Sequence, residues 1–253
     1  MSHPFLDAPL PLAFAHRGGA AEGDENTAEA FGRAVALGYR YIETDVHTTA
    51  DGVPVVFHDP HLLRLTGTSG TVAGMRWADL AALRVGGAGA VPRLEDVLTA
   101  WPDVRFNIDI KADGAVAPTV EVLRRAGMAD RVLLASFSDQ RLAEARTLAG
   151  PTFATSLGSR SVARLKAASV VGLPLRLPAG VVAAQVPPRA RRLTVVDRRF
   201  LSYAHRLGLQ VHCWTIDDPD EMSRLLDLGV DGIMTDRLEV LRAIYSARGV
   251  WTA

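Results

Sequence analysis

The amino-acid sequence predicts an α/β protein, a (β/α)8 or TIM barrel in which eight parallel strands alternate with outer helices. Eight short runs rich in apolar and β-branched residues recur along the chain, and segments with Leu and Ala at three- and four-residue spacing separate them. The length of 253 residues suits one such barrel, and the 48% apolar content suffices for a sizeable core. Polar side chains follow several of the predicted strands, where barrels of this class carry their active sites.

Each predicted strand is a short apolar run, and each predicted helix is a longer segment with an apolar stripe. The strands are residues 11–15, 40–46, 104–110, 131–136, 152–156, 181–186, 209–214 and 231–235. The helices are residues 27–37, 115–126, 139–148, 160–169, 198–207, 219–228 and 238–247. Because strands and helices alternate, we expect neighbouring strands to run parallel and to be joined by crossover helices.

One segment, residues 59–95, interrupts this alternation. It is too long and too rich in glycine for an ordinary connection, and it contains a short helical pattern near residues 77–83. The sequence therefore predicts a small insertion after the second strand. No stretch rich in Pro, Gly or Ser is long enough to act as a linker, so we expect residues 1–253 to form a single domain.

The second predicted strand carries a pair of acidic residues on one face. Glu43 and Asp45 are two positions apart, so their side chains point the same way. Two buried carboxylates side by side need a cation or a proton, because unpaired buried charge is costly. The strand is followed by Asp51-Gly52, a strong hairpin signal. A two-residue turn at this point predicts that Asp45 lies opposite His58.

The order of these motifs is similar to that of the glycerophosphodiester phosphodiesterase family. That family has a His-Arg-Gly turn, a Pro-Glu-Asn-Thr segment, a Glu-x-Asp strand, an Asp-Gly turn and a His-Asp pair. The matching residues here are His16-Arg17-Gly18, Glu25-Asn26-Thr27, Glu43 with Asp45, Asp51-Gly52 and His58-Asp59. Residues 107–111, 136–137, 214–215 and 229–236 resemble the later strand ends, so the resemblance extends over roughly residues 11 to 245. It implies the same barrel fold and a phosphodiesterase activity.

His16 and His58 are the catalytic pair that this resemblance implies. The ordinary pKa of histidine is near 6.5, so one imidazole can accept a proton from the attacking hydroxyl while the other donates one to the leaving oxygen.

Glu43, Asp45 and Asp109 form the implied metal site. Donors that are all oxygen suit Mg²⁺ or Ca²⁺ and not zinc. Many family members have glutamate at the position of Asp109, and the shorter aspartate leaves open whether Asp109 binds the metal directly or through water. The alternative is that Arg17 and Lys111 neutralise these acids with no ion.

The remaining candidates surround the phosphate. Arg17 and Lys111 are expected to bind it, or to serve only as structural counter-ions. Trp214 is expected to form a wall of the substrate pocket, or to pack in the core. Glu25 and Asn26 either cap the first helix or support other site residues, or they take part in the chemistry directly. Asp236 and Thr235 are expected to end the last strand and cap a helix.

The predicted reaction is metal-dependent hydrolysis of a glycerophosphodiester to glycerol 3-phosphate and an alcohol. The resemblance also implies that the 2-hydroxyl of glycerol can attack phosphorus, which gives a cyclic phosphate that water then opens. Two alternatives are kept: a phospholipase D-like cyclising enzyme acting on lysophospholipids or sphingolipids, and a non-catalytic protein that binds phosphate ligands. Neither the alcohol nor the oligomeric state follows from the sequence.

Composition limits the partners and the location. The formal net charge is zero, so no overall field favours nucleic acid, and we expect a small-molecule substrate only. The arginines between residues 189 and 199 are interpreted as a solvated surface. The single cysteine, Cys213, cannot form an internal disulfide. The sequence shows neither a signal peptide nor a transmembrane segment, so a cytoplasmic location is expected.

Overall fold

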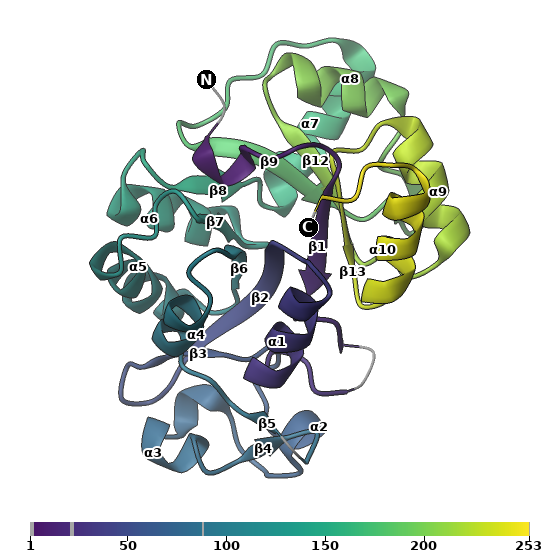
Figure 1. Cartoon of the computed structure of the whole chain (residues 1–253). Coiled ribbons are helices and arrows are strands. Elements are labelled where there is room, and N and C mark those ends of the chain that lie inside the picture. Colours follow the sequence, from purple (N-terminus) through teal and green to yellow (C-terminus); the bar gives the residue numbers. More distant parts are fainter. Residues whose placement is uncertain (1–2, 21–22, 88, 253) are drawn as a thin grey trace.

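The computed structural model describes residues 3–20, 23–87 and 89–252. Within these residues eight parallel strands close into a barrel, because β1 pairs with β13 on one side and with β2 on the other (Figure 1). The barrel strands are β1 (Leu12–His16), β2 (Tyr41–Thr48), β6 (Arg105–Ile110), β7 (Val132–Ala135), β8 (Ala154–Ser156), β9 (Val181–Val186), β12 (Gln210–Cys213) and β13 (Gly232–Thr235). The predicted fold class is confirmed.

Helices cover the outside of the barrel. They are α1 (Ala28–Ala36), α4 (Leu94–Ala100), α5 (Val116–Arg125) preceded by η4 (Asp113–Ala115), α6 (Asp139–Ala149), α7 (Ser159–Val171), α8 (Arg198–Arg206), α9 (Pro219–Leu228) and α10 (Leu238–Ala247). The sequence did not predict α4, which is too short to show a clear apolar period. Among the described residues, every helix is too short or too polar to cross a bilayer.

The start of α1 excludes helix capping, one of the roles considered for Asn26. The N-cap is Thr27, whose hydroxyl accepts a hydrogen bond from the amide of Ala30. Asn26 precedes the cap in a left-handed conformation, with φ of 60°. Its side chain therefore does not cap the helix and is free to point elsewhere.

Register between the strands places polar side chains of different strands side by side. His16 of β1 pairs with Glu43 of β2, and Asp45 of β2 pairs with Asp109 of β6. His16 and Asp109 lie at or next to the carboxyl ends of β1 and β6, and register places Glu43 and Asp45 of the longer β2 beside them. In parallel strands residues in register lie on the same level of the barrel, so closure alone brings these side chains to one mouth.

The barrel interior below this mouth is filled with apolar side chains. Phe14, Tyr41, Leu133 and Met234 are all buried there. At the opposite end the 3₁₀-helix η1 (Pro4–Leu6) places Phe5 edge-on against Tyr41, with 5.4 Å between ring centroids. The barrel is therefore a packed core and not a pore.

A buried polar layer lies within the same interior. His212 is fully buried and packs against the ring of Phe14. Its Nε2 is 3.0 Å from Gln210 Oε1, and its Nδ1 is 3.3 Å from Gln185 Nε2. Burial lowers the pKa of His212 to about 3, because no carboxylate compensates for the lost hydration of the imidazolium.

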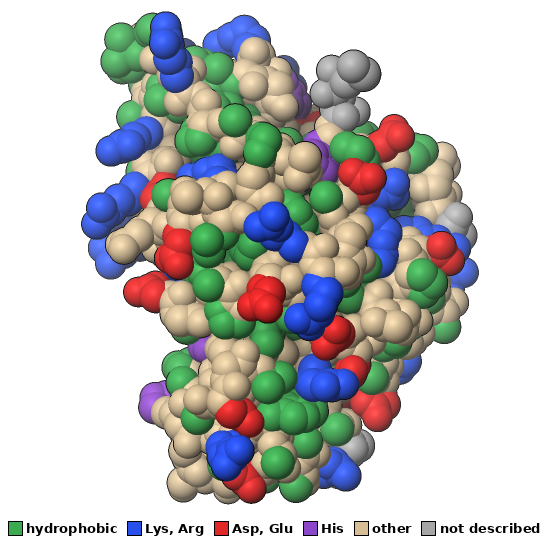
Figure 2. Space-filling view, turned by 90° about the vertical axis from the view of Figure 1, so that its left-hand side faces the viewer, with side chains coloured by type: hydrophobic (Ala, Val, Ile, Leu, Met, Phe, Trp, Pro, Cys, Tyr) green, Lys and Arg blue, Asp and Glu red, His purple; other side chains and the backbone are tan. Residues whose placement is uncertain are grey.

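The insertion after β2 contains a short antiparallel strand and several small elements. These are β3 (Pro54–Val56), α2 (Leu63–Thr66), η3 (Val72–Gly74), α3 (Trp77–Leu80), β4 (Arg84–Val85) and β5 (Gly89–Ala90). They enclose an apolar cluster that includes Val55, Phe57, Leu62 and Leu80. The insertion is the lower part of the molecule in Figures 1 and 2. Above it, basic and acidic side chains are intermixed over the middle of the face that Figure 2 shows.

The register of the β2–β3 hairpin corrects another prediction. Thr48 pairs with Pro54, and the amide of Phe57 donates to the carbonyl of Asp45. Because the amide of Thr49 also donates to the carbonyl of Val53, the loop between these two residues has three residues, ending at Gly52 with φ of 82°, rather than the two assumed from the Asp-Gly signal. Phe57 and not His58 lies opposite Asp45, and His58 follows after the strand has ended.

Stability should depend on the neutral state of His212. The unfolded chain binds a proton near pH 6.5 whereas the folded chain resists protonation to about pH 3, so stability is expected to fall as pH decreases through this window. Relative to wild type, His212→Gln should reduce the slope of unfolding free energy between pH 6 and pH 4 by about 1.4 kcal/mol per pH unit. Urea unfolding at each pH measures the slope.

The exposed His61 provides the control, because its substitution by Asn should leave the slope unchanged. An unchanged slope in His212→Gln would contradict the prediction.

A second hairpin, β10 (Arg189–Ala190) with β11 (Leu193–Thr194), follows β9 and borders the barrel mouth.

Candidate active site

A cavity of about 460 Å³ opens at the carboxyl ends of the barrel strands. Its lining includes every residue that the sequence predicted to be catalytic, metal-binding or phosphate-binding, namely His16, Arg17, Glu43, Asp45, His58, Asp109, Lys111 and Trp214. Glu25 and Asn26 are buried and contact the lining residues without belonging to it. The barrel therefore brings together candidates that are up to 198 positions apart in the sequence.

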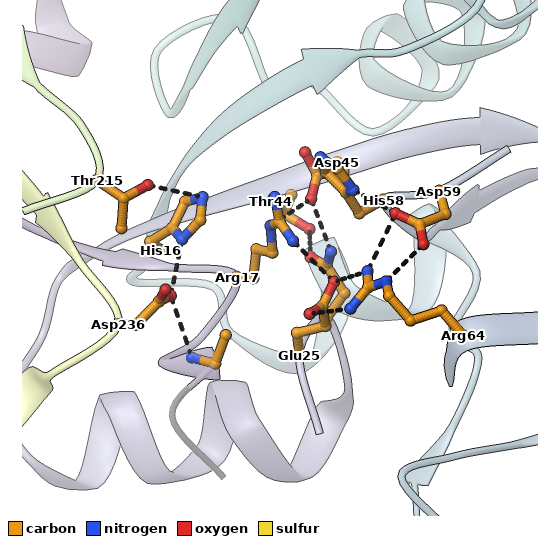
Figure 3. A network of polar contacts seen from close by, with 12 residues as sticks. His16, Arg17, Glu25, Thr44, Asp45, His58, Asp59, Arg64, Thr215 and Asp236 are labelled. Atoms are coloured by element: carbon orange, nitrogen blue, oxygen red, sulfur yellow. Dashed lines mark hydrogen bonds and ion pairs between the residues drawn. The ribbon is translucent and has the colours of Figure 1, made fainter. Parts of the chain in front are cut away.

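His16 forms a pair with a carboxylate from the last strand. Its Nδ1 is 2.7 Å from Asp236 Oδ1, while its Nε2 is 3.8 Å from Glu43 Oε2 and 3.5 Å from Thr215 Oγ1 (Figure 3). Burial lowers the pKa of His16, but the hydrogen bond to Asp236 and the charge of Glu43 outweigh it and raise the pKa above its ordinary value.

Asp236 therefore does not have the role that the sequence predicted. Its carboxylate accepts from His16 and from the amide of Ala20, and does not cap a helix. Its own amide and the Thr235 hydroxyl both donate to Asp217 Oδ1, at 2.8 and 2.9 Å. The loop after β13 is thereby held with the Asp236 carboxylate directed at His16.

His58 forms a second pair of the same kind. Its Nδ1 is 2.6 Å from Asp59 Oδ1, and the guanidinium of Arg64 donates to both oxygens of Asp59. The hydrogen bond from Arg64 is the largest reason that the pKa of Asp59 falls to about 2. On the other side, His47 Nε2 is 3.0 Å from the backbone carbonyl of His58. His58 is thus held on two sides, although it lies beyond the strand.

Arg17 connects Asp45 of β2 with Glu25, which precedes α1. Its Nε is 3.1 Å from Asp45 Oδ2, and one terminal nitrogen is 2.8 Å from Glu25. Glu25 also accepts from Arg64, so one carboxylate links Arg17 to the insertion. Asn26 donates to Asp45 Oδ2 at 2.8 Å and accepts from a threonine of β2. Arg17 and Asn26 both have positive φ, which a non-glycine residue adopts at a cost.

The three acids and Lys111 form a buried charged cluster. Lys111 Nζ is 2.8 Å from Asp45 Oδ1 and 2.6 Å from Asp109 Oδ2. Burial and the charge of Asp45 raise the pKa of Glu43. Burial likewise raises the pKa of Asp109, with Lys111 opposing it. Three carboxylates thus face two nearby cations, Lys111 and Arg17, and the cluster has more negative than positive groups.

The donor set is suited to a hard cation, but not in the arrangement that the side chains adopt here. Asp109 Oδ1 is buried without a hydrogen-bond donor. Lys111 lies between Asp45 and Asp109, and no three His, Cys, Asp or Glu side chains within residues 3–20, 23–87 and 89–252 are grouped closely enough to hold a metal ion. A cation held by Glu43, Asp45 and Asp109 therefore requires the Lys111 ammonium to move aside.

Two aromatic side chains also line the cavity. Trp214 follows β12, and its ring lies edge-on to Phe137 with 5.3 Å between centroids. The same Phe137 ring faces Lys111 Nζ at 5.8 Å. Ser136, by contrast, is buried and donates its hydroxyl to the carbonyl of Ile110, so this hydroxyl is already engaged and is not placed as a nucleophile.

The sequence did not predict that Asp236, Arg64 and His47 belong to or contact the two histidine–carboxylate pairs. Asp59 belongs to the His-Asp motif that the sequence analysis identified, so the motif indicated that it lies next to His58. Asp236 is 220 positions from His16 and gave no local indication of the contact. Arg64 belongs to the insertion, whose packing against the barrel mouth no periodicity predicts.

Comparison with known proteins finds relatives that cover nearly the whole chain. A relative from Mycobacterium tuberculosis, named "Probable glycerophosphodiester phosphodiesterase 2", is 41% identical over 244 residues, which are 95% of this chain and 92% of that protein. A human relative named "Lysophospholipase D GDPD1" is 26% identical over 92% of this chain and 85% of its own length. A solved structure from Silicibacter pomeroyi is 27% identical, with a TM-score of 0.82 over 99% of this chain and all of that one.

Residues 16–240 match the family described as the glycerophosphoryl diester phosphodiesterase family. This range begins at His16 and includes Asp236, so it contains both histidine–carboxylate pairs and all three acids of the buried cluster. The chain therefore belongs to the glycerophosphoryl diester phosphodiesterase family of phosphoric diester hydrolases.

Proposed function

We propose that this protein hydrolyses glycerophosphodiesters to glycerol 3-phosphate and an alcohol, with His16 and His58 as the acid–base pair. The observation that supports this most strongly is the presence of two imidazoles, each bound through Nδ1 to its own carboxylate, in one cavity with three buried acids. A carboxylate at Nδ1 sets the ring orientation and leaves Nε2 for proton transfer. The relative from M. tuberculosis carries the name of this activity.

In the proposed first step His58 accepts the proton of the glycerol 2-hydroxyl, which attacks phosphorus. His16 donates its proton to the oxygen of the departing alcohol, a role that suits its raised pKa. The products are the alcohol and a cyclic phosphate. In the second step His16 accepts a proton from water, the water oxygen attacks phosphorus, and His58 returns a proton to the 2-oxygen.

The cations of the cavity hold the phosphate during both steps. Arg17 is fixed by Asp45 and Glu25, so its guanidinium is oriented before the substrate arrives. Lys111 carries a compact ammonium on a flexible four-carbon stem, so it would leave Asp45 and Asp109 to bind the phosphate.

Glu43, Asp45 and Asp109 would then hold Mg²⁺ or Ca²⁺, which would offset the charge that develops on the phosphate oxygens. The orphaned Asp109 Oδ1 and the excess of carboxylates support this assignment.

The cytoplasmic location stays a prediction from the single cysteine, Cys213, which is buried.

Removing either imidazole should abolish most of the activity. We expect His16→Ala and His58→Ala each to lower kcat for glycerophosphocholine by about 10²–10⁴, the usual contribution of one general acid or base. The assay is choline release under saturating substrate. His61→Ala removes an exposed histidine of the insertion and should behave as wild type. Turnover within a few-fold of wild type in either active-site variant would exclude the acid–base assignment.

Asp236 should act by orienting His16. Asp236→Asn keeps the size of the side chain, but its amide can donate to Nδ1 and so favours the opposite tautomer. We expect kcat to fall by roughly a hundredfold with KM changed much less, because the group does not reach the substrate. Steady-state kinetics separate the two constants. If kcat stays within threefold of wild type, the carboxylate is only structural.

Metal removal should stop turnover. After treatment with EDTA and removal of the chelator, activity is expected to be lost and to return with Mg²⁺ or Ca²⁺. Asp109→Asn should raise the metal concentration that gives half-maximal activity, because it removes a negative donor. A stripped sample with full activity would show that Arg17 and Lys111 alone neutralise the phosphate.

The alternatives from sequence predict different results. A phospholipase D-like cyclising enzyme would leave the cyclic phosphate as its final product, which phosphorus NMR distinguishes from glycerol 3-phosphate. A non-catalytic binding protein would bind glycerol 3-phosphate without releasing choline from any substrate.

A further inference from the structure

The guanidinium of Arg64 lies between two carboxylates, Asp59 and Glu25, and donates two hydrogen bonds to each (Figure 3). Its Nε is 2.5 Å from Asp59 Oδ2, and its Nη1 is 3.0 Å from Glu25 Oε2. Its Nη2 donates to both residues, at 3.0 Å to Asp59 Oδ1 and at 2.8 Å to Glu25 Oε1. The planar fork of an arginine allows this double contact, which the single nitrogen of a lysine does not reproduce.

The two oxygens that Nη2 contacts are the same ones that hold the site residues. Asp59 Oδ1 is 2.6 Å from His58 Nδ1, and Glu25 Oε1 accepts from Arg17 Nη1 at 2.8 Å. One terminal nitrogen of the insertion is therefore two contacts away from the proposed base and two contacts away from the proposed phosphate-binding arginine. A displacement of this nitrogen would disturb both His58 and Arg17.

The backbone on both sides of Arg64 is fixed by the core of the insertion. Leu62 is fully buried in its apolar cluster, and the amide of Leu62 donates to the carbonyl of Gly70. The amide of Gly86 donates to the carbonyl of Leu65. The guanidinium is therefore oriented by packing that lies outside the active-site cavity, and the fold of the insertion determines where it points.

The carboxylates that Arg64 contacts are shielded from water, so these contacts carry more weight than an ion pair on a free surface. The side chain of Glu25 is 7% exposed and that of Asp59 is 23% exposed. Burial raises the pKa of Glu25, but the hydrogen bond from Arg64 and the other ion pairs outweigh it, and the pKa is lowered overall. Removal of Arg64 would leave this buried carboxylate with less compensating charge.

We propose that Arg64 is a positioning residue that orients the general base and the phosphate-binding arginine together. It acts through Asp59 on His58 and through Glu25 on Arg17, and it lies outside the cavity lining itself. The inference rests on the proposed function, which defines the roles of His58 and Arg17. It gives the insertion a part in catalysis, because one of its side chains aligns two groups that must act on the same phosphate.

Arg64→Lys and Arg93→Lys form a matched pair of variants. Arg93 is 41% exposed, compared with 48% for Arg64, and its Nε and Nη2 donate to both oxygens of Asp96, outside the cavity lining. Each change keeps the charge and replaces the fork by one ammonium. We expect Arg64→Lys to lower kcat for choline release from glycerophosphocholine by roughly tenfold or more and to raise KM by roughly threefold. Arg93→Lys should leave both constants within about twofold of wild type.

Two double-mutant cycles separate positioning from a purely structural role. In an Asp59→Asn background, Arg64→Lys should change kcat by about twofold at most, because the link to His58 is already broken, but it should still raise KM. In a Glu25→Gln background the effect on KM should be lost and the effect on kcat should remain. Equal fold-changes in both backgrounds and in the wild-type background would show a structural role only and would overturn the proposal.

Urea unfolding establishes that each variant is folded under the assay conditions. If Arg64→Lys does not fold, Arg64→Gln, which keeps an N–H donor without the charge, takes its place in the same cycles. A kcat within threefold of wild type in the folded variant would also overturn the proposal, while choline release by wild type leaves the proposed function standing. If wild type releases no choline, the proposed function itself fails, and this proposal fails with it.

Discussion

Burial of three carboxylates at one end of the barrel is the constraint on which the rest of the site depends. Two neighbouring strands supply these carboxylates. Glu43 and Asp45 lie on β2, and the register with β6 pairs Asp45 with Asp109, so the three side chains stay close together. Buried like charges are tolerated only with compensating cations. Lys111 and Arg17 compensate part of this charge, and burial followed by the charge of Asp45 raises the pKa of Glu43. A cavity with this excess of negative charge and an orphaned Asp109 oxygen is suited to receive a cation together with a phosphate.

The insertion is connected to this cluster through a chain of ion pairs, and Arg64 is its central member. It contacts Asp59, which holds His58, and Glu25, which holds Arg17 (Figure 3). A half-exposed arginine between two carboxylates would contribute little on a free surface. Here each carboxylate is also engaged with a site residue, so Arg64 fixes the geometry of both. The insertion thus has a role in assembling the charged part of the cavity.

The sequence by itself determined the barrel and most of the inventory of the site. Strand and helix periods are local properties of the chain, and all eight strands follow from them. The Glu43–Asp45 pair was predicted to share a face because a strand repeats every two residues, and both line the cavity. His16, His58 and Asp109 were found through motif order. The short helix α4 was not predicted, and the predicted β2–β3 register was wrong because one extra loop residue shifted the pairing.

Only the tertiary structure decided which partner each of these residues has. The pairing of His16 with Asp236 spans 220 positions and exists because β13 closes against β1. The pairing of Asp59 with Arg64 depends on how the insertion folds onto the barrel mouth. Secondary structure follows from nearest neighbours along the chain, but hydrogen bonds between distant side chains follow from closure, which no local pattern encodes.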